Sequence, residues 1–103
     1  ASTSLRREFK FSILVPAADY YPAAEPGEQV LLQGVVDCYF ETLEGITVVD
    51  FKTDRVTRRT VAERAEEYRP QLTAYSRALE EITGKPVARR CLWFFAIDQA
   101  VEV

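Results

Sequence analysis

The sequence predicts an α/β domain in which a mainly antiparallel sheet packs against one helical segment. Apolar and polar residues alternate along residues 8–15, which is the period of a strand with one buried face. Two further β-rich stretches, residues 29–41 and 46–52, are separated by a short turn. Residues 60–83 have helical spacing, and an apolar run over residues 88–98 indicates one more strand. The expected order is therefore βββαβ.

The strands are defined by their alternation and by the residues that separate them. The alternating apolar positions of the first strand are Phe9, Phe11, Ile13 and Val15. Residues 16–28 contain three prolines and a glycine, and because such residues interrupt a hydrogen-bonded ladder, we expect a loop there. A turn at residues 42–45 joins the second and third strands into a central hairpin. The last apolar run carries few charges, as expected for a strand covered on both faces.

The helical stretch has recognisable start and stop signals. Thr60 followed by Glu63 has the form of a capping box, and Gly84 and Pro86 are typical of a helix end. Pro70 lies inside the stretch, where it removes one helical hydrogen bond and disfavours helix in the preceding residue. We therefore expect either two helices or one kinked helix.

Length and composition limit the class of protein. A chain of 103 residues with 48% apolar residues is sufficient for one compact domain. It does not begin with Met, so we expect a fragment of a longer polypeptide. No stretch approaches the roughly 18 apolar residues of a membrane span, and no signal peptide is evident, so a cytoplasmic protein with no membrane partner is expected. Cys38 and Cys91 match no metal-binding spacing, which favours buried free thiols over a disulfide.

Two aspartates of the central hairpin are expected to face each other. If residues 42–45 form the turn, paired positions sum to 87, and Asp37 lies opposite Asp50. Asp50 and Lys52 share one face of the third strand, since side chains alternate along a strand. The same alternation assigns Asp37 to one face of the second strand with Leu31, Gln33, Val35 and Tyr39, and assigns to the other face Val30, Leu32, Gly34, Val36, Cys38 and Phe40.

Opposed carboxylates on a largely apolar face require an explanation. Their Cβ atoms would lie about 5 Å apart, which destabilises a pair of like charges, and a divalent cation between them resolves the conflict. Oxygen ligands suit Mg²⁺, for which Mn²⁺ could substitute. The alternative is that Asp37 and Asp50 are surface residues at strand ends that Lys52 screens as an ion pair. Because Asp is disfavoured inside strands, the metal site is the better interpretation.

Further polar residues extend this candidate site. Lys52 could hold the attacking water, lower its pKa or stabilise charge on a phosphate. Gln71 lies within the apolar arc of the predicted helix, where it could satisfy a backbone group or hold substrate. Arg55, Arg58 and Arg59 form a basic run in a chain whose net charge is −3, and charge alone favours an ordinary solvated loop.

Several of these motifs occur together in a known order. They are Gly34-Val35-Val36-Asp37, then Val48-Val49-Asp50-Phe51-Lys52-Thr53-Asp54, then Tyr68-Arg69-Pro70-Gln71-Leu72 with Tyr75, and finally Gly84-Lys85-Pro86. The set resembles the RecB-like nuclease domain of the PD-(D/E)XK superfamily, and most closely the C-terminal domain of the AddA-type helicase–nuclease proteins. A lone D-x-K is weak evidence, whereas the whole ordered series is specific. The resemblance implies a restriction-endonuclease-like fold.

The resemblance also implies roles for individual residues. Asp37 and Asp50 would ligate the metal together with the main-chain carbonyl of Phe51, and Lys52 would be catalytic. Gln71 and Tyr75 match a Q-x-x-x-Y element associated with DNA and with organisation of the active site. The family generally carries a histidine on an upstream helix near the metal, whereas this chain has no histidine. Activity is therefore expected of the complete protein rather than of these residues alone.

The function implied is that of a metal-dependent deoxyribonuclease, an exonuclease that hydrolyses phosphodiester bonds during DNA end processing and double-strand-break repair. The chain has no Walker A motif, so the helicase region would lie elsewhere in the same polypeptide, and the partner would be the second subunit of the helicase–nuclease. Two alternatives remain open, a nuclease-fold module that binds DNA without cleaving it and a stand-alone nuclease. The basic run is expected to contact DNA phosphates through Arg55, Arg58 and Arg59, with Gln71 and Tyr75 nearer the reacting bond.

Overall fold

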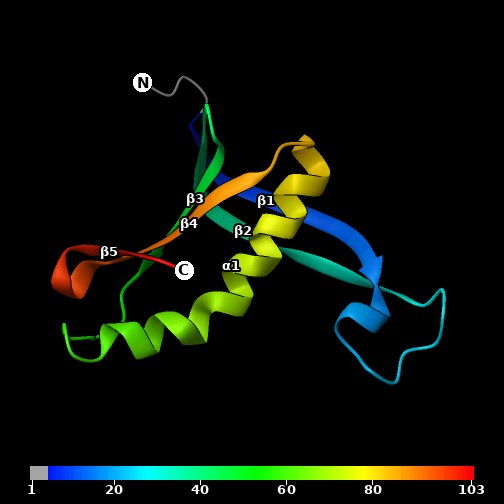
Figure 1. The fold of residues 1–103 in the computed structure, drawn as a ribbon, viewed down its shortest axis with the longest axis horizontal. Coiled ribbons are helices and arrows are strands. Elements are labelled where there is room, and N and C mark those ends of the chain that lie inside the picture. Colours follow the sequence, from blue (N-terminus) through cyan, green and yellow to red (C-terminus); the bar gives the residue numbers. More distant parts are fainter. Residues whose placement is uncertain (1–4) are drawn as a thin grey trace.

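The computed structural model describes residues 5–103, which form one five-stranded sheet and a long helix (Figure 1). The strands are β1 (Arg6–Pro16), β2 (Gln29–Thr42), β3 (Gly45–Lys52), β4 (Val87–Phe94) and β5 (Gln99–Glu102), and the helix is α1 (Val61–Thr83). Their spatial order in the sheet follows the sequence. Three neighbouring pairs are antiparallel, and β3 pairs with β4 in parallel. The predicted α/β class with a mainly antiparallel sheet is confirmed.

Helix α1 is the connection between the two parallel strands, and it crosses one face of the sheet (Figure 1). The side chains between the helix and this face form a hydrophobic core. Its largest fully buried members are Phe94, Ile46, Leu72, Leu79, Leu92, Val15, Val36 and Val48. We call this side of the sheet the helix face and the other side the open face. Within the described residues, no helix is long and apolar enough to cross a membrane.

The helix is continuous through Pro70, and its axis bends in the middle of its length (Figure 1). Of the two forms expected, the single kinked helix is therefore the one observed. Gly84 ends it with a φ of 72°, and its N–H donates to the Glu80 carbonyl, as a left-handed C-cap requires. The capping-box prediction is wrong, because the Thr60 hydroxyl accepts instead from the Thr57 N–H at 2.9 Å.

The last part of the chain differs from the expected single strand. Strand β4 ends at Phe94, a short 3₁₀ turn follows (η2, Phe95–Ile97), and Asp98, with a φ of 45°, reverses the chain into β5. The order is thus βββαββ. The prediction that residues 88–98 are covered on both faces is also wrong, because Phe95 is 52% exposed. A continuous apolar run reads the same in a covered strand as in one with an open face, so the sequence could not separate them.

Strand β2 changes its alternation at Asp37. Val36 and Tyr39 both belong to the core, although alternation places an even- and an odd-numbered residue on opposite faces. The pairing with β1 joins Arg7 to Cys38 and Phe9 to Val36, so Glu8 opposes Asp37, and Glu8 has a φ of 50°. The predicted face for Leu31, Gln33 and Val35 is therefore wrong, and their exposure fits the open face.

Candidate active site

The central hairpin has the register expected from its turn. Glu41 pairs with Ile46 and Tyr39 with Val48, so paired positions sum to 87. Backbone pairing in this ladder is observed as far as Cys38 and Val49. One step beyond, the carboxylate of Asp37 accepts a hydrogen bond from the Phe51 N–H through Oδ2 at 2.9 Å. A side chain has thus replaced the backbone partner where the strands part, and this bond holds Asp37 beside Asp50.

Asp50 is a buried carboxylate with neighbours of both charges. It is 3% exposed, and its Oδ2 lies 2.7 Å from Nζ of Lys52. Burial raises the pKa of Asp50 to about 6, a hydrogen bond with the Asp37 side chain adds to the rise, and Lys52 opposes it. The ion pair of the surface alternative is therefore present, but it is buried, which that alternative does not explain.

Lys52 is held by groups from two elements. In addition to Asp50 on β3, its ammonium donates to Oε1 of Gln71 on α1 at 2.8 Å, and it lies 3.9 Å from the centre of the Tyr68 ring. The amide nitrogen of Gln71 in turn donates to the Tyr75 hydroxyl at 3.0 Å. Five of the residues singled out from the sequence are thus joined in one cluster, which we call the aspartate–lysine cluster: Asp37, Asp50, Lys52, Gln71 and Tyr75.

Tyr75 is fixed by close packing with β1 and β2. Its ring meets that of Phe11 edge to face, with centroids 5.8 Å apart. A Cβ on Gly34 would lie 3.1 Å from Phe11 and 3.3 Å from Tyr75, so a larger residue would displace one of the rings. Burial raises the pKa of Tyr75, and the charges of Asp50 and Asp37 add to the effect. The hydroxyl therefore remains a neutral hydrogen-bonding group.

Sequence reasoning missed Tyr68 and Asp54 as members of this site. The Tyr68 hydroxyl donates to both oxygens of Asp54, at 3.0 and 2.8 Å, and its ring faces Lys52. A signal was present, because Tyr68 precedes Gln71 by three residues and so lies on the same side of a helix. The position of Asp54, in an irregular segment after β3, could not be inferred from a period.

The oxygen-rich donor set of Asp37 and Asp50 fits a hard divalent cation, whose preferred ligands are carboxylates and carbonyls. Among residues 5–103, no group of three His, Cys, Asp or Glu side chains is close enough to hold a metal. The side chains would therefore supply two carboxylates. Phe51 lies between Asp50 and Lys52, its N–H is used by Asp37, and its ring, 45% exposed, packs against Phe95.

The three arginines of the basic run lie outside this cluster. Arg55, Arg58 and Arg59 are exposed on the segment between β3 and α1, and Arg55 borders a hollow of about 330 Å³. In the part of the chain that the structure describes, none of the three forms an ion pair with an acidic side chain. Their charge is therefore available to a ligand.

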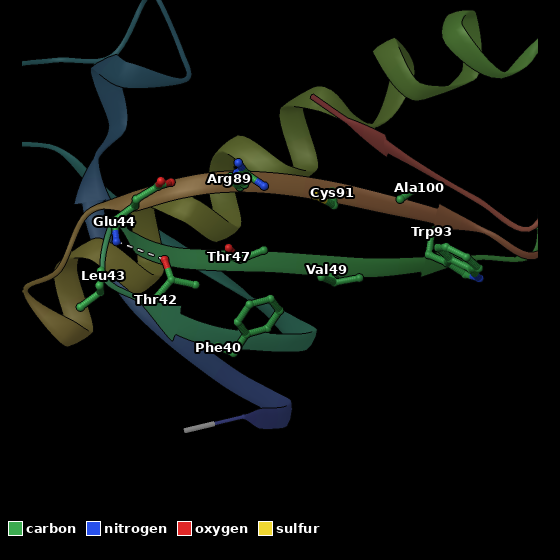
Figure 2. Close-up of a pocket in the computed structure, with 10 residues that line it drawn as sticks. All are labelled: Phe40, Thr42, Leu43, Glu44, Thr47, Val49, Arg89, Cys91, Trp93 and Ala100. Atoms are coloured by element: carbon green, nitrogen blue, oxygen red, sulfur yellow. Dashed lines mark hydrogen bonds between the residues drawn. The ribbon is translucent and has the colours of Figure 1, made fainter. Parts of the chain in front are cut away.

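A hollow of about 660 Å³ lies on the open face of the sheet, away from the cluster. Its lining includes Phe40, Val49 and Trp93 together with Arg89 (Figure 2). None of the residues of the aspartate–lysine cluster lines it. Cys91 also lies there, and both cysteines are free, as predicted.

The fold and the clustered acidic and basic residues are those of a nuclease domain. The sequence matches the PD-(D/E)XK nuclease superfamily over residues 2–102, and the chain belongs to this superfamily. Its mixed sheet and helix are consistent with a restriction-endonuclease-like fold.

Among curated proteins, its relatives are AddA-type ATP-dependent helicase/nuclease proteins. The AddA-type ATP-dependent helicase/nuclease protein of Acetivibrio thermocellus is 46% identical over 99 residues, covering 92% of this chain and 8% of the relative. The protein of the same name from Syntrophomonas wolfei is 41% identical over 99 residues, covering 96% of this chain and 8% of the relative. The chain thus spans less than a tenth of the length of these relatives.

Proposed function

We propose that this nuclease domain hydrolyses DNA phosphodiester bonds with the help of Mg²⁺ or Mn²⁺. The observation that carries the proposal is the burial of Asp50 between a second carboxylate and Lys52. A protein that needed only stability at this position would be served as well by an apolar residue. A buried acidic pair with an adjacent ammonium is instead suited to a reaction in which charge develops on a phosphate.

Asp37, Asp50 and the main-chain carbonyl of Phe51 are the groups proposed to hold the cation. When bound, a divalent cation supplies Lewis-acid catalysis, activates water and stabilises the leaving oxygen. Asp37 is already oriented by the Phe51 N–H, which leaves its other oxygen for a ligand. The raised pKa of Asp50 reflects a carboxylate that gains from a positive charge placed between it and Asp37.

Lys52 is proposed to act on the substrate rather than on the cation. Its ammonium is a point charge that can stabilise a phosphate or orient the attacking water. Gln71 accepts one of its protons and is itself held by Tyr75, so these two residues fix the direction of Lys52. The same amide and hydroxyl are polar groups at the surface of the cluster and are proposed to contact DNA.

The wider role follows from the relatives and remains part of the proposal. We infer that the domain works as an exonuclease on DNA ends during double-strand-break repair, beside a helicase region of the same polypeptide and a second protein chain of the helicase–nuclease. The name helicase/nuclease that the relatives carry supports this inference. Arg55, Arg58 and Arg59 are proposed to hold DNA by its phosphates, which gives binding without sequence preference.

The test is cleavage of end-labelled DNA with Mg²⁺ by the full-length protein and its variants. Lys52→Ala is expected to abolish cleavage while Mn²⁺ binding, measured by calorimetry, is nearly unchanged, and Asp50→Ala is expected to lose both. Lys85→Ala is a matched control, because Lys85 also pairs with an acidic residue, Glu41, but at the surface. A wild type that binds DNA and never cleaves it would favour the non-catalytic alternative.

A further inference from the structure

The ammonium of Lys52 lies in a cage of three unlike partners. One is the charged carboxylate of Asp50 at 2.7 Å, the second is the neutral amide oxygen of Gln71 at 2.8 Å, and the third is the face of Tyr68, 3.9 Å from Nζ. The Lys52 side chain is only 11% exposed. A cation over an aromatic face is attracted to it, and more strongly where water is excluded.

Only one of these partners would be contested in the working site. Asp50 cannot serve Lys52 and a divalent cation equally, because both claim the same carboxylate, and the cation would also repel the ammonium. The attraction of Lys52 to Asp50 is therefore weakest when the lysine is needed. Gln71 and the Tyr68 ring carry no net charge, so neither is drawn toward the cation in the same way, and they can retain the lysine.

Tyr68 is itself fixed by Asp54. Its hydroxyl donates to both carboxylate oxygens, and this hydrogen bond, together with burial, raises the pKa of Tyr68, so the hydroxyl stays protonated and continues to donate. Asp54 has a further neighbour in Arg64 at 3.6 Å. Donation to a carboxylate also makes the phenol ring more electron-rich, which strengthens its attraction for a cation.

We propose that Tyr68, anchored by Asp54, is a positioning residue that keeps the ammonium of Lys52 in place when Asp50 engages the divalent cation. The inference rests on the proposed nuclease function. It assigns to the Asp54–Tyr68 pair a role that ordinary packing does not require, since packing alone would not need an aromatic face opposite a buried ammonium. The pair acts through Lys52 and does not touch the substrate.

Kinetic measurements on the full-length protein separate this role from a structural one. Tyr68→Leu removes the ring and is expected to lower kcat roughly tenfold, with KM for DNA and the Mg²⁺ requirement unchanged. Tyr68→Phe keeps the ring over Lys52 and should retain most of the rate, and Asp54→Asn, which can still accept from the hydroxyl, should fall between them. Tyr21→Leu is the matched control, because Tyr21 is 60% exposed in a loop.

A second readout does not depend on cleavage. Labelling with an amine-reactive reagent, quantified by mass spectrometry, measures the accessibility of Lys52 relative to the exposed Lys10 in the same sample. With saturating Mg²⁺, Lys52 should stay protected in the wild type and become labelled in Tyr68→Leu. Equal labelling of Lys52 in the two proteins would overturn the positioning role. A wild type that cleaves no DNA would instead refute the proposed function, so the two failures are distinguishable.

Discussion

Asp50 is a residue whose neighbours could be anticipated in part from the sequence. The turn length set the hairpin register, the register placed Asp37 near Asp50, and the strand period placed Lys52 on the same face. These inferences succeeded because turn geometry and a period of two are local properties. The cage around Lys52 was not predictable, because the Tyr68 ring reaches it only through the fold of α1 onto the sheet.

The raised pKa of Asp50 predicts how the metal-free domain responds to pH. The pKa rises from 3.8 to about 6 on folding, so the group contributes stability below pH 4 that is lost as pH increases through about 6. The shift corresponds to about 3 kcal/mol at most. Asp50→Asn should remove this dependence and be more stable than wild type at pH 7 in chelator. Urea denaturation at pH 4 to 7.5 measures it, and parallel curves for the two proteins would contradict the assignment.

Gly34 gives a second prediction for a single residue. In Gly34→Ala, the new methyl group would lie 3.1 Å from Phe11 and 3.3 Å from Tyr75, so one of the rings must shift, which costs about 1 to 3 kcal/mol. Because Tyr75 holds Gln71, cleavage should fall further than stability explains. Thermal melting and cleavage rates of the variant test this. Restoration of both by the added substitution Phe11→Leu would identify the crowded contact.

Elements were predicted well where each carried its own punctuation, and poorly where neighbouring strands decided the geometry. Gly84 ended α1 as expected, because a left-handed cap is a property of that residue. The change of face at Asp37 was missed, because it depends on Glu8 adopting a φ of 50°, and glutamate has no marked preference for that region. Strand β5 was missed because the turn at Asp98 lies within an apolar run.

The kink of α1 gives a prediction at the scale of the element. Pro70 lies between Tyr68 and Gln71, the two helix residues that contact Lys52, so the bend sets their relative direction. Pro70→Ala restores a backbone donor and is expected to raise the melting temperature. The straighter helix should move one contact away from Lys52, so kcat should decrease. A variant with unchanged kcat would mean that the bend is not needed to form the cage.

At the scale of the whole molecule, the distribution of charge matters more than its sum. The net charge of −3 gives no indication of DNA binding, yet the segment between β3 and α1 exposes Arg55, Arg58 and Arg59 directly after the end of β3 that carries Lys52. The fold thus brings positive charge near a buried acidic site. Local fields of this kind guide a polyanion even on an acidic protein.

This arrangement predicts salt-dependent binding that is blind to sequence. The double variant Arg58→Ala, Arg59→Ala should weaken DNA binding equally for unrelated sequences and reduce the slope of log affinity against log salt by about 2. Arg69→Ala is the control, because Arg69 is already paired with Glu66. Fluorescence anisotropy between low and moderate salt measures the slope. A loss confined to one sequence would argue for base contacts instead.

The bond between the Phe51 N–H and the Asp37 carboxylate also makes that amide a natural reporter of the site. A backbone N–H held by a side chain exchanges its hydrogen with solvent whenever that side chain turns away, without unfolding of the strand. Asp37→Ala should therefore accelerate exchange at Phe51 while leaving Val48, deep in the core, protected. Binding of a ligand that reorients Asp37 would alter the same rate. Hydrogen–deuterium exchange of one peptide could thus follow occupancy of the site in a protein too large for most spectroscopy.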